Sequence, residues 1–172
     1  MIVAAAGRVV LCALLAAACV SDLRTRRIPN TLVLVTALAG VIFSAVTKSF
    51  AVGLTQAGAG LLTGLAIWIP FYALRMLGAG DVKLFAAAAT FLGPRTAVDA
   101  AVYTALYGGA LALLYMVLHS GFKSTAIRLG NAMHQPSLLQ NPTTSNRRRM
   151  PYALAIAAGV LTVIWLPGYT IL

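Results

Sequence analysis

Residues 52–74, VGLTQAGAGLLTGLAIWIPFYAL, form an apolar run that contains no charged residue. A helix needs about 20 residues to cross the hydrocarbon core of a bilayer, and this run is long enough. It includes Gly60 and Gly64, a small-xxx-small pair that would let a second helix approach closely. The run therefore predicts a membrane-spanning helix that packs against a neighbouring helix.

Similar runs recur along the chain, which has 172 residues, of which 60% are hydrophobic and 9% are charged. A soluble domain would carry roughly 25% charged residues, so the composition excludes that class. We predict an all-α, polytopic membrane protein, with one transmembrane domain over residues 1–172 in contact with lipid. The six expected spans cover residues 2–21, 30–47, 52–74, 79–94, 97–118 and 151–170.

The basic residues predict how the chain is oriented. A net charge of +10 could indicate a nucleic-acid partner, but most of the positive charge lies in loops between the apolar runs, so none is expected. Successive loops of a multi-pass protein lie on alternate sides of the membrane. If the loop after the first span is cytoplasmic, ten of the 13 basic residues lie on the cytoplasmic side. Both termini are then outside the cytoplasm. The cytoplasmic loop of residues 119–150 is expected to hold a short surface helix from Phe122 to Met133.

Three acidic residues occur, Asp22, Asp81 and Asp99, and there is no glutamate. The same alternation puts Asp22 and Asp81 at the cytoplasmic face and Asp99 at the opposite face. A carboxylate near hydrocarbon is expensive, so its default interpretation is functional, with a partner to be named. Asp22 and Asp81 are the obvious partners for each other.

Two carboxylates at one depth favour the chemistry of an aspartic protease, in which two carboxyl groups share one proton. The ionised group activates a water molecule, and the protonated group hydrogen-bonds the scissile carbonyl. Structural alternatives stay open: Asp81 could be a helix N-cap, and Asp22 could pair with Arg24 or Arg26. An alternative function is a small proton-coupled transporter or channel subunit, whose aspartates usually lie near the bilayer midplane.

The residues around the two aspartates form two motifs. Asp22 is followed after five residues by Ile28-Pro29-Asn30, and Asp81 lies in Gly78-Ala79-Gly80-Asp81-Val82-Lys83. With this spacing and the six spans, the chain resembles the type IV prepilin peptidases, membrane aspartic proteases of the GxGD type. The resemblance implies that Asp22 and Asp81 are the catalytic pair. It also implies cleavage of prepilin precursors after a glycine, on the cytoplasmic side of the bacterial inner membrane.

The other motif residues are expected to support this pair. Gly78 and Gly80 permit close backbone approach just before the helix that carries the second aspartate. Pro29 and Asn30 either shape the start of the second span or contact the substrate. Lys83 either tunes the pair, binds a substrate carboxylate, or anchors its helix at the interface.

The larger, bifunctional members of that family carry paired Cys-x-x-Cys motifs and also methylate the new N-terminus. Here nothing precedes the first span, and Cys12 and Cys19 form no such motif, so we expect cleavage without methylation. We expect no metal and no other cofactor, and we interpret the two cysteines as small buried side chains. The compact form resembles peptidases dedicated to tight-adherence (Flp-type) pili. The sequence does not specify the oligomeric state.

Overall fold

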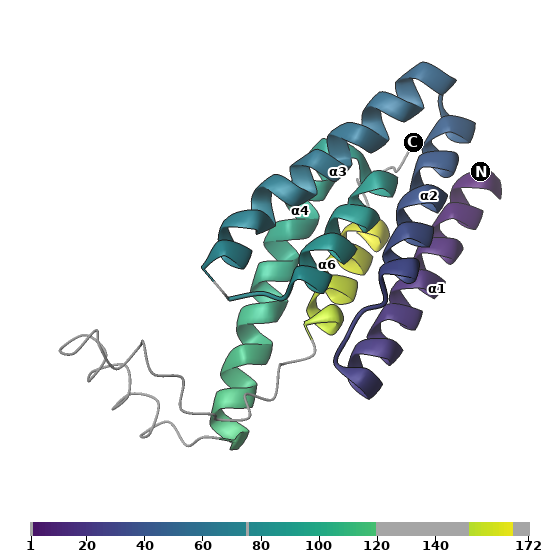
Figure 1. The fold of residues 1–172 in the computed structure, drawn as a ribbon. Coiled ribbons are helices and arrows are strands. Elements are labelled where there is room, and N and C mark those ends of the chain that lie inside the picture. The colour runs from purple at the N-terminus through teal and green to yellow at the C-terminus, as the bar shows by residue number, and fades with distance from the viewer. Residues whose placement is uncertain (1, 75, 120–151, 167–172) are drawn as a thin grey trace. The chain divides into compact units, whose positions relative to one another are not determined.

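A computed structural model describes residues 2–74, 76–119 and 152–166 (Figure 1). Its helices are α1 (Ile2–Thr25), α2 (Asn30–Thr47), α3 (Phe50–Ala73), α4 (Ala79–His119) and α6 (Ala153–Trp165). The described residues contain no strand, which confirms the all-α prediction for them. The chain divides into two compact units, residues 1–108 with 151–172, and residues 109–150. The surface helix expected from Phe122 to Met133 lies outside the described residues.

Four helices in the described part of the chain are long and apolar enough to cross a membrane: Ala5–Thr25, Asn30–Thr47, Phe50–Ala73 and Ala79–Leu114. The apolar helix α6 is shorter, with 13 residues, and covers about 20 Å at 1.5 Å per residue. The chain is therefore a multi-pass membrane protein. Six crossings, and the side of the membrane on which the termini lie, stay predictions.

Helix α2 has its small and polar residues inside and its large apolar residues outside. Its buried residues are Thr36, Gly40 and Ser44, which recur every four positions along one face. Leu38 and Ile42 are exposed on the outside. A water-soluble helix would bury these side chains, whereas lipid solvates them and small residues let helices approach each other. The arrangement suits a helix surrounded partly by lipid.

The predicted small-residue pair of α3 packs against α4. A Cβ atom at Gly60 would meet the carbonyl oxygen of Ala89, and a Cβ at Gly64 would lie 2.9 Å from the Cα of Ala86. Neither position has room for a side chain, so the two helix backbones lie in close contact. At Gly58, by contrast, a Cβ would meet nothing within 4 Å.

Helix α4 consists of two legs, residues 79–92 and 94–119, joined at Gly93. Gly93 has φ 74° and ψ 173°, which is not helical, and Pro94 suits the first turn of a new helix. Tyr152 packs on Gly108 of the second leg, and its ring contacts Trp68, which also contacts Phe85 on the first leg. A straight helix would separate Phe85 from Gly108 by about 35 Å. As far as Gly108, the second leg therefore runs back along the first (Figure 1).

This reversal corresponds to the boundary between the expected spans 79–94 and 97–118. The turn is tighter than expected, because a single glycine changes the chain direction and no separate loop is needed. The first leg alone is shorter than the ~30 Å hydrocarbon core, at 1.5 Å per residue, as the sequence indicated.

Helices α1 and α6 are antiparallel neighbours. Cys19 and Asp22, near the end of α1, both contact Ala153 at the start of α6. From there α6 runs back beside α1 (Figure 1). Most of α6 is buried, and a Cβ at Gly159 would clash with Thr104 on the second leg of α4. The core of the bundle thus lies around α6.

Candidate active site

Asp22 is the one charged side chain that is buried in the described part of the chain, with 7% of its surface exposed. The sequence placed it just after the first span, but α1 continues to Thr25, so Asp22 lies within the helix. Its Oδ2 accepts a hydrogen bond from the backbone N–H of Ala153, with an N···O distance of 3.3 Å. The first N–H groups of a helix lack partners within it, and the helix dipole favours a negative charge there. This contact offsets part of the cost of burying the carboxylate.

The structural alternative for Asp22 is an ion pair with Arg24 or Arg26. Of these two residues, Arg26 follows one turn further along and contacts Asp22 through the backbone. Arg26 has φ 52°, in the left-handed region that residues other than glycine seldom adopt. Its backbone N–H donates to the carbonyl of Asp22 at 2.9 Å, so α1 ends in a tight turn.

Two hydroxyl groups hold the loop that follows α1. The Oγ of Ser21 and the Oγ1 of Thr25 both donate to the carbonyl oxygen of Arg27, at 3.0 Å and 3.1 Å. The sequence analysis missed both residues. Serine and threonine just before a helix end often bond to nearby backbone, and that tendency was the available signal.

The last three residues of the first motif have different surroundings. Ile28 is partly buried and packs against the core. Pro29 is the N-cap of α2, and its carbonyl oxygen accepts the first backbone hydrogen bonds of that helix. Asn30 is the first helical residue and is exposed. The expected role of Pro29 in shaping the helix start is therefore visible, one position before the helix itself.

Asp81 is the third residue of α4 and bonds back to its own helix start. Its Oδ2 accepts a hydrogen bond from the backbone N–H of Gly78 at 3.2 Å. This is the acidic half of a capping box, so the structural alternative for Asp81, an N-cap, is corrected to a capping contact from the third helical position. A Cβ at Gly78 would lie 2.9 Å from the same oxygen. Glycine at this position leaves room for the carboxylate.

The two motifs meet at Gly80. A Cβ at Gly80 would lie 3.4 Å from the Cβ of Ile28, so the loop after α1 packs on the first turn of α4. That loop begins just beyond Asp22, and the turn contains Asp81. The structure therefore brings the two motifs into direct contact at one end of the bundle.

The start of α6 packs near both motifs. Ala153 bonds to Asp22. The residue before it, Tyr152, has its ring centroid 6.1 Å from that of Trp68, which in turn lies 5.6 Å from that of Phe85, one turn beyond Asp81. The sequence analysis missed Tyr152 and Ala153, because no local pattern marks them as neighbours of residues on other helices.

Cys19 also contacts this region. Its Sγ donates to the carbonyl oxygen of Ala153, with an S···O distance of 3.4 Å. Cys19 is buried and Cys12 is partly buried, so the expected burial is confirmed for the first and is only partial for the second. Cys19 lies three residues before Asp22, hence on the same helix face, and this spacing was a usable signal.

The remaining charged candidates lie apart from these contacts. Lys83 is exposed on the first leg of α4. Asp99 lies on the second leg, just beyond the turn at Gly93. Measured along the first leg, Gly93 is about 18 Å from Asp81. Among the described residues, no group of three or more histidine, cysteine, aspartate or glutamate side chains could hold a metal ion.

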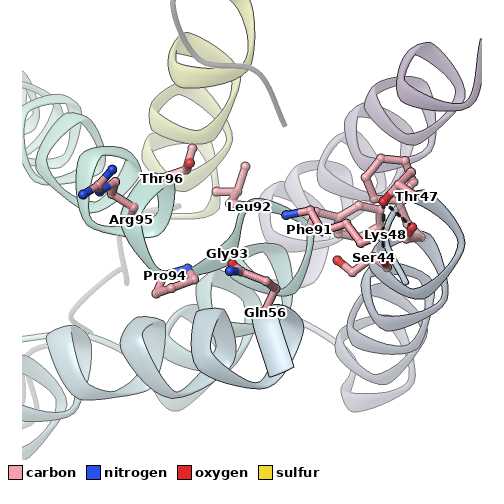
Figure 2. Close-up of a pocket in the computed structure, with 11 residues that line it drawn as sticks. Ser44, Thr47, Lys48, Gln56, Phe91, Leu92, Gly93, Pro94, Arg95 and Thr96 are labelled. Carbon is pink, nitrogen blue, oxygen red and sulfur yellow. Dashed lines mark hydrogen bonds between the residues drawn. The ribbon is translucent and has the colours of Figure 1, made fainter. Parts of the chain in front are cut away.

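A pocket of about 350 Å³ lies at the other end of the bundle, around the turn of α4 (Figure 2). Its lining includes Ser44, Lys48, Gln56 and Arg95, and no predicted site residue. Figure 2 shows Gln56 beside Gly93, where a Cβ would lie 2.8 Å from the Gln56 Oε1. This hollow and the two aspartates therefore occupy opposite ends of the molecule.

Comparison with known proteins agrees with the two motifs. A profile of the type IV leader peptidase family matches residues 9–117, more than half of the chain. The matched region contains Asp22, Asp81 and every residue of both motifs. No curated protein and no solved structure matches the chain. The resemblance seen in the sequence is confirmed at the level of the family.

Proposed function

The chain belongs to the type IV leader peptidase family, and from this premise we propose that it is an aspartic endopeptidase with Asp22 and Asp81 as its catalytic pair. The observation that carries the proposal is the contact between the two motifs, Ile28 against Gly80, at the end of the bundle where both acids lie. Burial of Asp22 adds support. A buried carboxylate costs free energy, so its default interpretation in a membrane protein is functional.

The proposed reaction uses two carboxyl groups that share one proton. The ionised carboxylate takes a proton from a water molecule. At the same time the oxygen of that water molecule attacks the carbonyl carbon of the scissile peptide. The protonated carboxyl group hydrogen-bonds the carbonyl oxygen, which gains negative charge. The C–N bond then breaks, and a proton passes to the leaving amine. Because the pair titrates as a unit, neither aspartate has a fixed role.

Backbone hydrogen bonds orient both acids for this reaction. The Oδ2 of Asp22 is bound by the N–H of Ala153, and the Oδ2 of Asp81 is bound by the N–H of Gly78. Ala153 is the first residue of α6 and Gly78 directly precedes α4, so each carboxylate is held by a backbone donor at a helix start. This arrangement suits a site in which two oxygens must face one water molecule.

The proposed substrates are prepilin precursors, cleaved after a glycine just before their hydrophobic helix. The excess of basic residues in alternate loops supports cleavage at the cytoplasmic face of the bacterial inner membrane. The narrower proposal, short-leader Flp-type precursors cleaved without methylation, rests on the compact span pattern and the cysteine content of the sequence.

The supporting motif residues have separate proposed roles. Gly78 makes room for the carboxylate of the second aspartate, and Gly80 makes room for the loop after α1. Pro29 starts α2, and the exposed Asn30 is available to contact substrate. Exposed Lys83 anchors its helix at the membrane interface.

The test is cleavage of a prepilin by the protein in membranes. Asp22→Asn and Asp81→Asn are each expected to lower cleavage by about 1,000-fold or more, while membrane insertion is unchanged. Asp99→Asn is the matched control and is expected to cleave normally, because Asp99 lies beyond the turn of α4. Normal cleavage by either of the first two variants would show that the pair is wrong.

Proton-coupled transport is the alternative function, and the same variants address it. A transporter would need an acid near the bilayer midplane, whereas both aspartates here lie at one end of the bundle. Proton flux that depends on Asp22, together with normal prepilin cleavage by Asp22→Asn, would favour transport over proteolysis.

A further inference from the structure

The pocket at the turn of α4 is lined by the end of α2, by Gln56 of α3, and by the turn itself (Figure 2). Two lining residues are basic, Lys48 just after α2 and Arg95 on the second leg of α4. Figure 2 shows them on either side of Gly93. The described lining contains no acid, and Asp99, one turn beyond Arg95, is not part of it. The pocket therefore presents two basic side chains that no lining residue neutralises.

A third basic residue, Arg8, lies at the same end of the bundle. It follows Gly7 of α1, where a Cβ would clash with the ring of Phe43, and Phe43 lines the pocket. The Nε of Arg8 is buried and has no hydrogen-bond partner among the described residues. Arg8, Lys48 and Arg95 are the three basic residues that the alternation of loops places away from the cytoplasm. Their gathering at one end runs against the usual distribution of positive charge, so it favours a role in binding an anion.

The polar groups of the lining are mainly donors. The hydroxyl groups of Ser44 and Thr47 already donate to backbone carbonyl oxygens, at 3.0 Å and 2.9 Å. The donors that remain are the ammonium group of Lys48, the guanidinium group of Arg95 and the side-chain amide of Gln56. The second leg of α4 also begins here, and the first N–H groups of a helix favour a negative charge. Cationic donors beside a helix start are the groups with which proteins bind phosphate.

The size and position of the pocket narrow the ligand further. Its volume of about 350 Å³ is near the lower end of the range of about 300–1,000 Å³ for small-molecule sites, which suits a phosphate group with a small substituent. Phe43 and Phe91 form an apolar part of the wall, with ring centroids 5.6 Å apart. The membrane-spanning helix α2 ends at the pocket, so the pocket lies near a membrane surface, where lipid headgroups are found.

We propose that the pocket at the turn of α4 binds a phosphate group between Lys48 and Arg95, with the amide of Gln56 as a further donor. Two sources supply this chemistry at a membrane surface, the headgroup of an anionic phospholipid and the free phosphate ion. The inference does not depend on the proposed function, because the pocket lies at the end of the bundle opposite the aspartates and its test measures binding.

The test is a titration of the purified full-length protein in a nonionic detergent with phosphatidylglycerol, and separately with phosphatidylcholine. We expect phosphatidylglycerol to raise the thermal unfolding temperature and phosphatidylcholine to leave it unchanged. Lys48→Gln and Arg95→Gln should each weaken the affinity for phosphatidylglycerol about tenfold, because each removes a charged hydrogen bond. Gln56→Glu keeps the size of the side chain but adds a negative charge, so it should weaken the affinity at least as much.

Arg27→Gln is the matched control, because Arg27 is an exposed cation at the end of the bundle that carries the aspartates. Its affinity for phosphatidylglycerol should change by less than about twofold. Each variant is also heated without lipid, and an unfolding temperature equal to that of the unchanged protein shows that its fold is intact.

Inorganic phosphate distinguishes the two sources. If it raises the unfolding temperature and displaces the lipid, the free ion is enough to fill the site. If only phosphatidylglycerol binds, and Lys48→Gln and Arg95→Gln weaken that binding, the source is the lipid headgroup. Three results would overturn the proposal: no effect of either phosphate compound, full affinity in both Lys48→Gln and Arg95→Gln, or an equal loss in Arg27→Gln.

Discussion

Asp81 accepts its backbone hydrogen bond from Gly78, three residues earlier in the same turn, whereas Asp22 accepts one from Ala153, 131 residues away on another helix. The first arrangement is complete once α4 has begun to form. The second exists only after α6 has packed on α1. One half of the proposed site is therefore local, and the other half depends on the assembled bundle. The variants below attack each half separately.

The largest effect is expected from Ala153→Leu, which acts on the long-range half. Ala153 is fully buried against α1, so a larger side chain would push α6 away and move the N–H that binds Asp22. We expect an approximately 100-fold slower cleavage and a loss of about 1–3 kcal/mol in the free energy of unfolding. The neighbouring Leu154 is 36% exposed, and Leu154→Ala should change cleavage little. Near-normal cleavage by Ala153→Leu would mean that the orientation of Asp22 does not depend on α6.

A smaller effect is expected from Gly78→Ala, which acts on the local half. The added methyl group would lie 2.9 Å from the Oδ2 of Asp81 and would turn the carboxylate away from its backbone donor. Loss of that hydrogen bond should slow cleavage about tenfold without changing membrane insertion.

Gly80→Ala is the comparison for this variant. Its methyl group would lie 3.4 Å from the Ile28 side chain, an ordinary contact distance, so cleavage should fall by about twofold at most. If Gly80→Ala cleaved more slowly than Gly78→Ala, contact between the motifs would matter more than the capping of Asp81.

The smallest effect is expected from Cys19→Ala. This change removes the S–H donor to the Ala153 carbonyl and leaves the N–H contact to Asp22 in place. The lost bond is weak, so cleavage should slow about twofold. Cys12→Ala lacks any such contact and serves as the control. A larger effect from Cys12→Ala than from Cys19→Ala would contradict the role given to the Ala153 contacts.

Much of the fold could be predicted from hydropathy. The expected span 30–47 coincides with α2, and 52–74 differs from α3 by two residues at one end and one at the other. The first helix was predicted too short, because the polar segment from Ser21 to Thr25 ends the apolar run but not the helix. Hydropathy locates a lipid-facing run, whereas hydrogen bonding decides where a helix stops.

The turn within α4 was harder to predict in detail. Gly93 and Pro94 indicated a boundary, and the structure shows a reversal made by one glycine at φ 74°. The consequence for the site is large, because the reversal brings Gly108 back beside the end that carries Asp81. A break in a hydropathy pattern does not say at what angle the two legs meet.

The sequence alone determined that the chain crosses a membrane and that Asp22 and Asp81 are the acids to examine. Both conclusions follow from local chemistry, since lipid requires long apolar runs and each motif spans fewer than ten residues. Only the tertiary structure decided which groups surround these acids: the N–H of Ala153 on Asp22, and the contact of Ile28 with Gly80 beside Asp81. The physical reason is that such contacts join residues far apart in the chain, and they depend on how the helices pack rather than on any periodic pattern.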